Sequence, residues 1–336
     1  KLNIEKGLWL LFIIFIFISC LYSVDKINSL KFSIVFSFFV FIGIGTSCCI
    51  NKKYYKYFVV SLLFCLSIHL IFTFLNIVNI EMVANICEQI YGYETTKQIR
   101  RWAYEYHNYS GISIQIGLNA IFQTLFISIN FSYLLHTKMK NKIAIILLIM
   151  GWIALISTGK ETFYLANIMS SIILLGMYLK RVNPKLFSRM IYAVIILFFV
   201  GFIVLIINFD TFMNLYYDKS IDSRFILYRD AIRAISQSPI IGNGINSIRS
   251  FSEHLTHNIY LQLTAETGII GLTLFIIALG YSFVSSFNKY NFYAFLKLYL
   301  IIILIVDGFF GNLLFDYRFL IPFFIICFST NCKESF

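Results

Sequence analysis

Residues 58–78, FVVSLLFCLSIHLIFTFLNIV, form an apolar run without a single Asp, Glu, Lys or Arg. A helix of this length is about 30 Å long, which is enough to cross the hydrocarbon core of a bilayer. Comparable runs recur along the whole chain, which is 59% hydrophobic and only 13% charged and so lacks the polar residues that would cover a soluble domain. Long unbroken apolar runs also exclude the alternating pattern of a membrane β-barrel. The sequence therefore predicts an all-α, polytopic membrane protein.

We expect about ten transmembrane helices, forming a single integral membrane domain over residues 1–336. The predicted spans are 7–23, 31–50, 58–78, 112–135, 143–157, 162–179, 190–208, 269–287, 292–306 and 317–330. The first run resembles the core of a signal peptide, but it has no clear small-x-small cleavage site, and we interpret it as a span.

Lys and Arg residues gather in every second connection between the predicted spans. They lie before the first span and after the second, fourth, sixth, eighth and tenth. Because basic connections stay on the cytoplasmic side during insertion, both termini are predicted to be cytoplasmic, and the long connections 79–111 and 209–268 to be extracytoplasmic. The net charge of +11 follows from this topology, so it gives no support for nucleic-acid binding.

The seven cysteines are scattered, and only Cys87 falls in a predicted outer connection. The chain has no CxxC pair and no Gly-rich phosphate loop. His254 beside Glu253 would suit a metal ion, but no second cluster in the sequence completes such a site. We therefore predict no disulfide framework, no metal and no cofactor.

The connection that leads into the predicted eighth span, SRFILYRDAIRAISQSPIIGNGINSIRSFSEHLTHNIYLQLTAETGIIG from Ser223 to Gly271, carries most of the candidate chemistry. Ser223 is predicted to cap a helix over residues 224–235. Phe225, Tyr228 and Ile232 would lie near one face of that helix, and Arg229 and Arg233 would lie on another. This pattern predicts an amphipathic helix at the membrane surface.

Helix-breaking and turn-forming residues follow this helix. Pro239 is expected to end it, and Gly242-Asn243-Gly244 to form a sharp turn. His257-Asn258 then opens the approach to the eighth span, where Gly268 and Gly271 would allow a bend or a close helix contact.

Taken together, Arg224, Pro-x-x-Gly-x-Gly, His257-Asn258-x-Tyr-Leu and Glu-x-Gly-x-x-Gly resemble the O-antigen ligase and polymerase family of bacterial membrane glycosyltransferases. Thr158-Gly159-Lys160 is similar to the family's Thr-x-Ser-Arg, with Gly in place of Ser and Lys in place of Arg. Arg101 with the segment 107–111 and Arg318 before the tenth span are looser counterparts. The resemblance covers roughly residues 95–320.

The resemblance implies transfer of a glycan from an undecaprenyl-diphosphate carrier to an acceptor hydroxyl at the outer face of the bacterial cytoplasmic membrane, without a nucleotide sugar or an obligatory metal. Arginine suits this chemistry because its fork of donors binds phosphate oxygens in pairs. Imidazole suits it because its pKa lies near neutrality, as a general base requires. The expected catalytic residues are His257 and Arg224. The expected substrate-binding residues are Lys160, Arg101, Arg229, Asn258 and Arg318.

Each of these residues also has a purely structural interpretation. The arginines could contact lipid headgroups, His257 could cap a helix, and Lys160 could pair with Glu161. Glu266 is expected to serve packing or hydrogen bonding rather than to act as a second base. The stripe of Gln115, Asn119 and Gln123 is expected to bond between helices, with a wall of the substrate cavity as the alternative. The aromatic residues Trp102, Tyr104 and Tyr106 could stack on sugar rings.

Three functions fit the pattern. The first is a polymerase that joins oligosaccharide repeat units on the lipid carrier, favoured by the short segment between Gly244 and His257. The second is a ligase that transfers finished glycan to lipid A core or to another acceptor. The third is a transporter of lipid-linked sugars, which would need ionisable residues at the bilayer midplane. The expected partners are the lipid-linked oligosaccharide, an acceptor glycan, membrane lipids, a flippase and a chain-length regulator.

Overall fold

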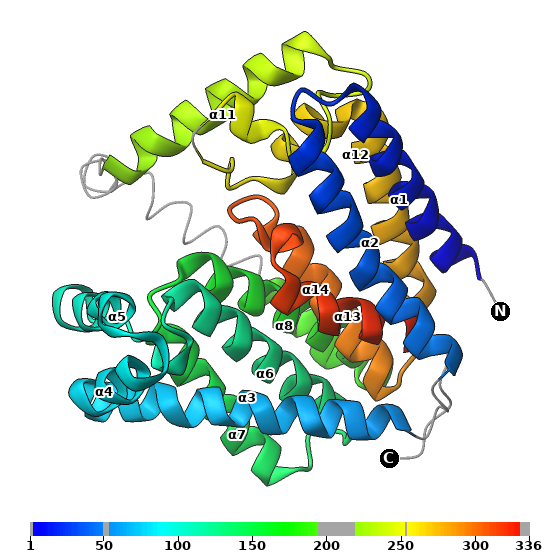
Figure 1. The fold of residues 1–336 in the computed structure, drawn as a ribbon. Coiled ribbons are helices and arrows are strands. Elements are labelled where there is room, and N and C mark those ends of the chain that lie inside the picture. The colour runs from blue at the N-terminus through cyan, green and yellow to red at the C-terminus, as the bar shows by residue number, and fades with distance from the viewer. Residues whose placement is uncertain (1–2, 50–53, 194–218, 253, 330–336) are drawn as a thin grey trace. The chain divides into compact units, whose positions relative to one another are not determined.

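The computed structural model describes residues 3–49, 54–193, 219–252 and 254–329, and the regular structure over these residues is helical (Figure 1). The α-helices are α1 (Ile4–Tyr22), α2 (Lys26–Cys49), α3 (Tyr55–Val78), α4 (Ile80–Tyr91), α5 (Tyr93–Tyr106), α6 (Ile116–His136), α7 (Lys142–Ile156), α8 (Glu161–Val182), α11 (Lys219–Gln237), α12 (Ile259–Phe287), α13 (Phe292–Asp307) and α14 (Tyr317–Ser329). Short 3₁₀ turns are η2 (Gly111–Ser113), η3 (Ile248–Ser250) and η4 (Leu313–Phe315). The prediction of an all-α protein is confirmed for this part of the chain.

Six of these helices, α1, α2, α3, α6, α8 and α12, are long and apolar enough to cross a membrane. The predicted fifth, ninth and tenth spans correspond to α7, α13 and α14, which have 15, 16 and 13 residues and are shorter than a full span. Residues 194–208 of the predicted seventh span lie outside the described residues. The chain is thus an integral membrane protein by its helices, while the number of ten spans stays a prediction.

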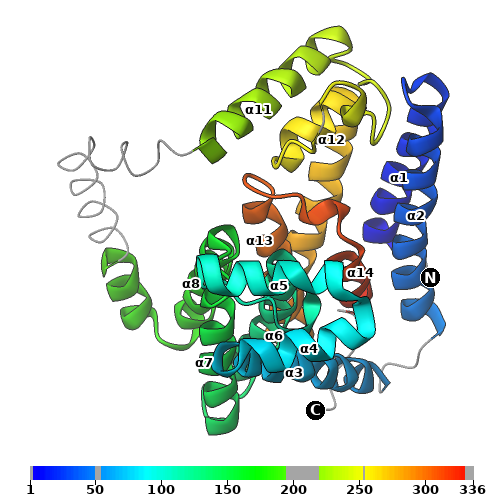
Figure 2. The same ribbon diagram turned by 60° about the vertical axis from the view of Figure 1, so that its left-hand side comes forward.

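The described chain divides into two compact units. The first comprises residues 1–9, 37–171 and 278–336, and the second comprises residues 10–36 and 172–277. In the first unit, α6 contacts α3, α7, α13 and α14, while α4 packs on α3 and α5 packs on α4 (Figure 2).

The polar stripe on α6 bonds within this first unit. The Asn119 amide donates to the Thr73 hydroxyl of α3 at 2.9 Å, and the Gln123 amide donates to Asn119 Oδ1 at 3.0 Å. Asn119 and Gln123 are fully buried, whereas Gln115 is exposed at the N-cap of α6. Gln123 also donates to the Thr73 hydroxyl at 3.3 Å. The interhelical interpretation is therefore confirmed for Asn119 and Gln123 and wrong for Gln115, which precedes the first turn of the helix.

Charged residues in the apolar interior of the first unit have partners. Lys297 of α13 is fully buried, and its ammonium bonds to the Glu5 carboxylate of α1 and, at 3.2 Å, to the Ser285 hydroxyl. Asp307, the last residue of α13, is buried and accepts from the Leu313 amide at 3.1 Å. Buried charges need such partners because desolvation without compensation costs several kcal/mol.

The connection 79–111 is not an open loop, because it contains the helix pair α4 and α5. Gly92, with φ 84°, joins the two helices. Val83, Ala84, Cys87 and Ile99 form a buried apolar cluster between them. The sequence analysis treated this segment only as a connection, since both helices are too short and too polar to be spans.

Candidate functional site

The helix that carries Arg224 and Arg229 is α11, in the second unit. It runs from Lys219 to Gln237, so the prediction of a helix over 224–235 is confirmed, whereas the prediction that Ser223 caps it is wrong, because the helix begins four residues earlier. It ends two residues before Pro239, as expected of a residue that cannot continue the helical hydrogen bonds.

Small side chains let α11 pack closely on its neighbours in the second unit. Ala231 and Ala234 are fully buried and form an apolar cluster with Ile248 and with Ala265 of α12. Leu227 extends this buried face. The opposite side of α11 carries Phe225 and Ile232, which are exposed, as a surface helix against lipid headgroups would require.

The two arginines occupy different sides of α11. Five helical residues turn the chain by about 500°, so Arg224 and Arg229 lie about 140° apart around the helix axis. Arg229 lies within about 40° of Phe225, on the outward side. Arg224 lies on the flank between the outward side and the face that packs on α12. Both side chains are exposed.

The turn that follows α11 is hydrogen-bonded to α12 at its kink, which lies at Gly268. The Ile269 amide donates to the Pro239 carbonyl at 3.0 Å, and the Gly244 amide donates to the Glu266 carbonyl at 2.8 Å. Gly242 has φ 76°, and a Cβ there would lie 2.3 Å from the Glu266 carbonyl oxygen. Gly268 has φ 63°, and a Cβ there would lie 2.2 Å from the Ile240 oxygen. The predicted turn and bend are confirmed. Each requires glycine, because a side chain at either position would clash with the backbone of the other segment.

Asn243, whose side chain the sequence analysis did not single out, joins α11 to α12. Its amide donates to the carbonyl of Ala234 at 2.8 Å and to the carbonyl of Ala265 at 2.9 Å. Its own carbonyl accepts from the Val24 amide, in the connection between α1 and α2, at 3.0 Å. The N-terminal hairpin of the second unit therefore braces the turn that precedes the candidate site.

His257 lies at the end of this braced loop with an exposed side chain and a left-handed backbone, φ 53°. Such a backbone costs a non-glycine residue about 1–2 kcal/mol and clusters at functional sites. The Thr256 hydroxyl accepts from the Asn258 amide at 3.2 Å, so it closes a turn around His257. Asn258 caps α12, because its Oδ1 accepts from the Leu261 amide at 3.0 Å. The cap is thus Asn258 rather than His257, whose side chain is exposed.

Lys160 and the segment 107–111 lie together in the first unit. The Tyr109 amide donates to the Ser157 carbonyl at 2.8 Å, and the Asn108 side chain covers Gly159 so closely that a Cβ there would lie 2.1 Å from Asn108 Oδ1. Thr158 is fully buried, and its hydroxyl accepts from the Lys160 amide at 3.4 Å. The structure therefore brings together two weak motifs that are 50 residues apart in the sequence.

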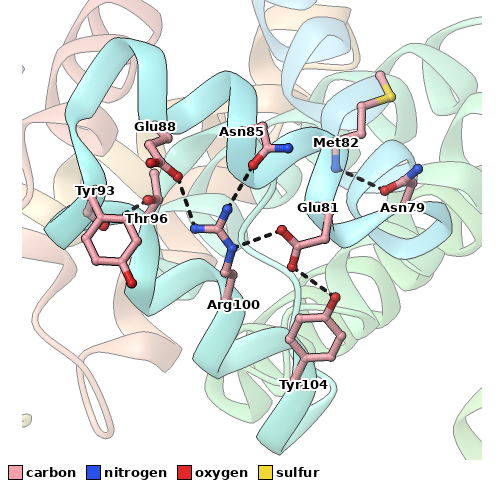
Figure 3. Close-up of polar contacts among 9 residues, drawn as sticks. All are labelled: Asn79, Glu81, Met82, Asn85, Glu88, Tyr93, Thr96, Arg100 and Tyr104. Atoms are coloured by element: carbon pink, nitrogen blue, oxygen red, sulfur yellow. Dashed lines mark hydrogen bonds and ion pairs between the residues drawn. The ribbon is translucent and has the colours of Figure 1, made fainter.

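Arg101 is exposed and pairs with Glu105 of its own helix at 3.1 Å. Its neighbour Arg100, which the sequence analysis did not consider, is held far more fully between α4 and α5 (Figure 3). Arg100 donates to Glu81 at 3.0 Å, to Asn85 at 2.9 Å and to Glu88 at 3.2 Å. The hydrogen bond to Glu81 is the main cause that raises the pKa of Arg100, so this arginine stays charged and orders the helix pair.

Arg318 lies in the first turn of α14, three quarters buried. Its guanidinium stacks on the Tyr317 ring at 4.6 Å and lies 3.7 Å from Asp316. Two of its nitrogens, Nε and Nη1, are buried and have no hydrogen-bond partner among the described residues. Because buried donors are nearly always satisfied in folded proteins, these two nitrogens suit an anionic ligand.

The candidate residues thus form two groups, one in each compact unit. Arg101, Lys160 and Arg318 belong to the first unit, and Arg224, Arg229, His257 and Asn258 belong to the second. Convergence of the two groups on one substrate stays a prediction. Within the described ranges, no group of three His, Cys, Asp or Glu residues could hold a metal ion.

The apolar helices and the exposed His257 on a braced loop define a helical membrane protein with a candidate site. Residues 145–276 match the family model described as O-Antigen ligase, and this confirms the resemblance to the O-antigen ligase and polymerase family over that segment. The matched residues include Lys160, Arg224, Arg229, His257 and Asn258, but not Arg101 or Arg318. Among curated proteins, the comparison found no match.

Proposed function

We propose that this protein is an O-antigen or surface-polysaccharide polymerase, which transfers an undecaprenyl-diphosphate-linked oligosaccharide to the hydroxyl of an acceptor glycan. The observation that carries the proposal is the exposed imidazole of His257, held on a left-handed turn inside the segment that matches the O-antigen ligase model. An exposed imidazole can reach a bound substrate and act as a general base.

In the proposed reaction, His257 takes the proton from the acceptor hydroxyl as its oxygen attacks the anomeric carbon of the donor sugar. The bond between that carbon and the diphosphate oxygen breaks, and undecaprenyl diphosphate leaves with the bonding electrons. A single in-line displacement inverts the anomeric centre. Negative charge collects on the departing diphosphate, so arginine donors positioned there lower the barrier without a metal ion.

Of the arginines, we propose Arg224 and Arg318 as ligands of the diphosphate. Arg224 lies on the flank of α11, and Arg318 has two buried nitrogens without a hydrogen-bond partner among the described residues, one of which lies 3.7 Å from the Asp316 carboxylate. Arg229 shares its side of α11 with Phe225 and Ile232, which suits a lipid headgroup better than the donor. Lys160, Arg101 and Asn258 remain proposed substrate contacts.

The test is the profile of lipid-linked glycans in cells that carry His257→Ala, beside cells without the protein. A matched control is His254→Ala, because His254 is an exposed histidine of the same loop. We expect single-repeat product with His257→Ala and in the deletion strain, and long chains with His254→Ala. Long chains with a correctly inserted His257→Ala protein would remove His257 from the mechanism.

The match to the O-Antigen ligase family model favours a second candidate function. A ligase would transfer a finished chain to lipid A core or to another acceptor, with the same roles for His257 and Arg224. The same profile separates the two functions, because loss of a ligase leaves long polymer attached to the carrier. The flippase and the chain-length regulator are proposed partners of the polymerase in particular.

A further inference from the structure

The left-handed backbone of His257 needs support from its surroundings, because such conformations persist in non-glycine residues only where neighbouring contacts enforce them. Thr256 supplies the nearest support. Its hydroxyl accepts from the Asn258 amide at 3.2 Å and lies 2.8 Å from the Asn258 carbonyl oxygen. Thr256 therefore bonds to the backbone of the residue that follows His257, and the two contacts span His257.

Behind Thr256, a line of buried polar groups leads into α12. The Thr256 hydroxyl lies 3.4 Å from Gln262 Oε1, and Gln262 Nε2 donates to Glu266 Oε1 at 3.0 Å. The same carboxylate oxygen accepts from the Ile248 amide at 3.4 Å. Thr256, Gln262 and Glu266 are all fully buried, so water does not compete for these contacts.

The donors and acceptors along this chain of hydrogen bonds have a defined order. The Glu266 carboxylate accepts the amide hydrogens of Gln262, and this turns the amide oxygen of Gln262 toward Thr256. The Thr256 hydroxyl has one hydrogen, which it donates either to Gln262 or to the Asn258 carbonyl, while it accepts from the Asn258 amide in both cases. Glu266 therefore orients Gln262, and Gln262 locates the hydroxyl that closes the turn.

We propose that Glu266, Gln262 and Thr256 form a positioning network that fixes the backbone of His257 and so aims its imidazole. Because all three side chains are fully buried and act through His257, they are positioning residues. The role of the imidazole itself rests on the proposed function, whereas the control of the His257 backbone does not.

The test uses the full-length protein in lipid nanodiscs, with the variants Gln262→Leu and Thr256→Val. Thr256→Ser keeps the hydroxyl and is the rescuing variant. Thr264→Val is the matched control, because Thr264 lies between Gln262 and Glu266 on α12 and, among the described residues, its hydroxyl bonds to the Tyr260 carbonyl of its own helix. We expect kcat to fall about 10- to 100-fold in the first two variants with the KM for the donor unchanged, since small misplacements of a reacting group cost this much.

A second readout is independent of activity. In protein with ¹³C-labelled histidine, the backbone signal of His257 is assigned by its loss in His257→Asn. We expect this signal to shift in Gln262→Leu and Thr256→Val, and to stay in place in Thr256→Ser and Thr264→Val. An unmoved His257 signal in both breaking variants would overturn the proposal. A shifted signal with unchanged transfer would uphold the network and instead refute the catalytic role of His257.

Discussion

Arg224 and Arg229 share a helix and a charge, but their positions on α11 separate what each can bind. Arg229 shares its side with the exposed Phe225 and Ile232, and Arg224 lies on the flank nearer to the packed face. A phosphate held by paired hydrogen bonds requires the planar fork of arginine, whereas a lipid headgroup accepts any cation at this level of the membrane.

At this scale we predict that Arg224→Lys lowers kcat/KM about 10- to 100-fold, while Arg229→Lys changes it less than about threefold. The expected difference corresponds to the roughly 1.5–3 kcal/mol of a charge-assisted hydrogen bond that lysine cannot reproduce in paired geometry. The measurement is transfer by purified protein in nanodiscs with a lipid-linked repeat unit as donor. Equal losses in the two variants would contradict the assignment.

At the scale of elements, the kink of α12 decides how the loop before the candidate site is held. Gly268 lies in the left-handed region, and its Cα approaches the backbone of Ile240 so closely that no side chain fits. The kink divides α12 into an approach segment, which carries Gln262 and Glu266, and the apolar remainder.

We predict that Gly268→Ala lowers the free energy of unfolding by at least about 2 kcal/mol, because backbone strain and a steric clash add. Gly280→Ala is the control on the same helix, since no atom lies within 4 Å of a Cβ there. Alanine should leave stability unchanged or raise it by up to about 1 kcal/mol at that position. Unfolding in mixed detergent micelles measures both variants, and a similar effect of the two would show that the kink is not a constraint.

At the scale of the whole molecule, the alternation of basic connections predicts that α5 faces outside and that the connection between α6 and α7 faces the cytoplasm. Tyr104 of α5 and Lys140 of that connection are both exposed, which makes them comparable labelling sites.

In a background without native cysteines, we predict that Tyr104→Cys reacts with a membrane-impermeant maleimide in intact spheroplasts. Lys140→Cys should react only after the membrane is permeabilised. Labelling of Lys140→Cys in intact spheroplasts would reverse the predicted orientation, and with it the proposed location of His257 at the outer face.

The sequence by itself determined the all-α class, the apolar helices and the loop in which His257 and Asn258 lie, because hydrophobic length, glycine and proline act locally along the chain. It also located the turn at Gly242 and the bend at Gly268. It missed the start of α11, which it placed five residues late, and the helix pair α4 and α5, since short polar helices leave no span-like signal.

Only the tertiary structure decided which polar groups meet. Packing brings together the segments whose side chains form these hydrogen bonds. Examples are the bonds of Arg100, those of Asn243, and those that join Glu266, Gln262 and Thr256. A buried donor or acceptor must find a partner, but the sequence does not show which of many polar residues folding brings within 3 Å. For the same reason the exposure of the His257 side chain follows from the folded loop and not from the motif.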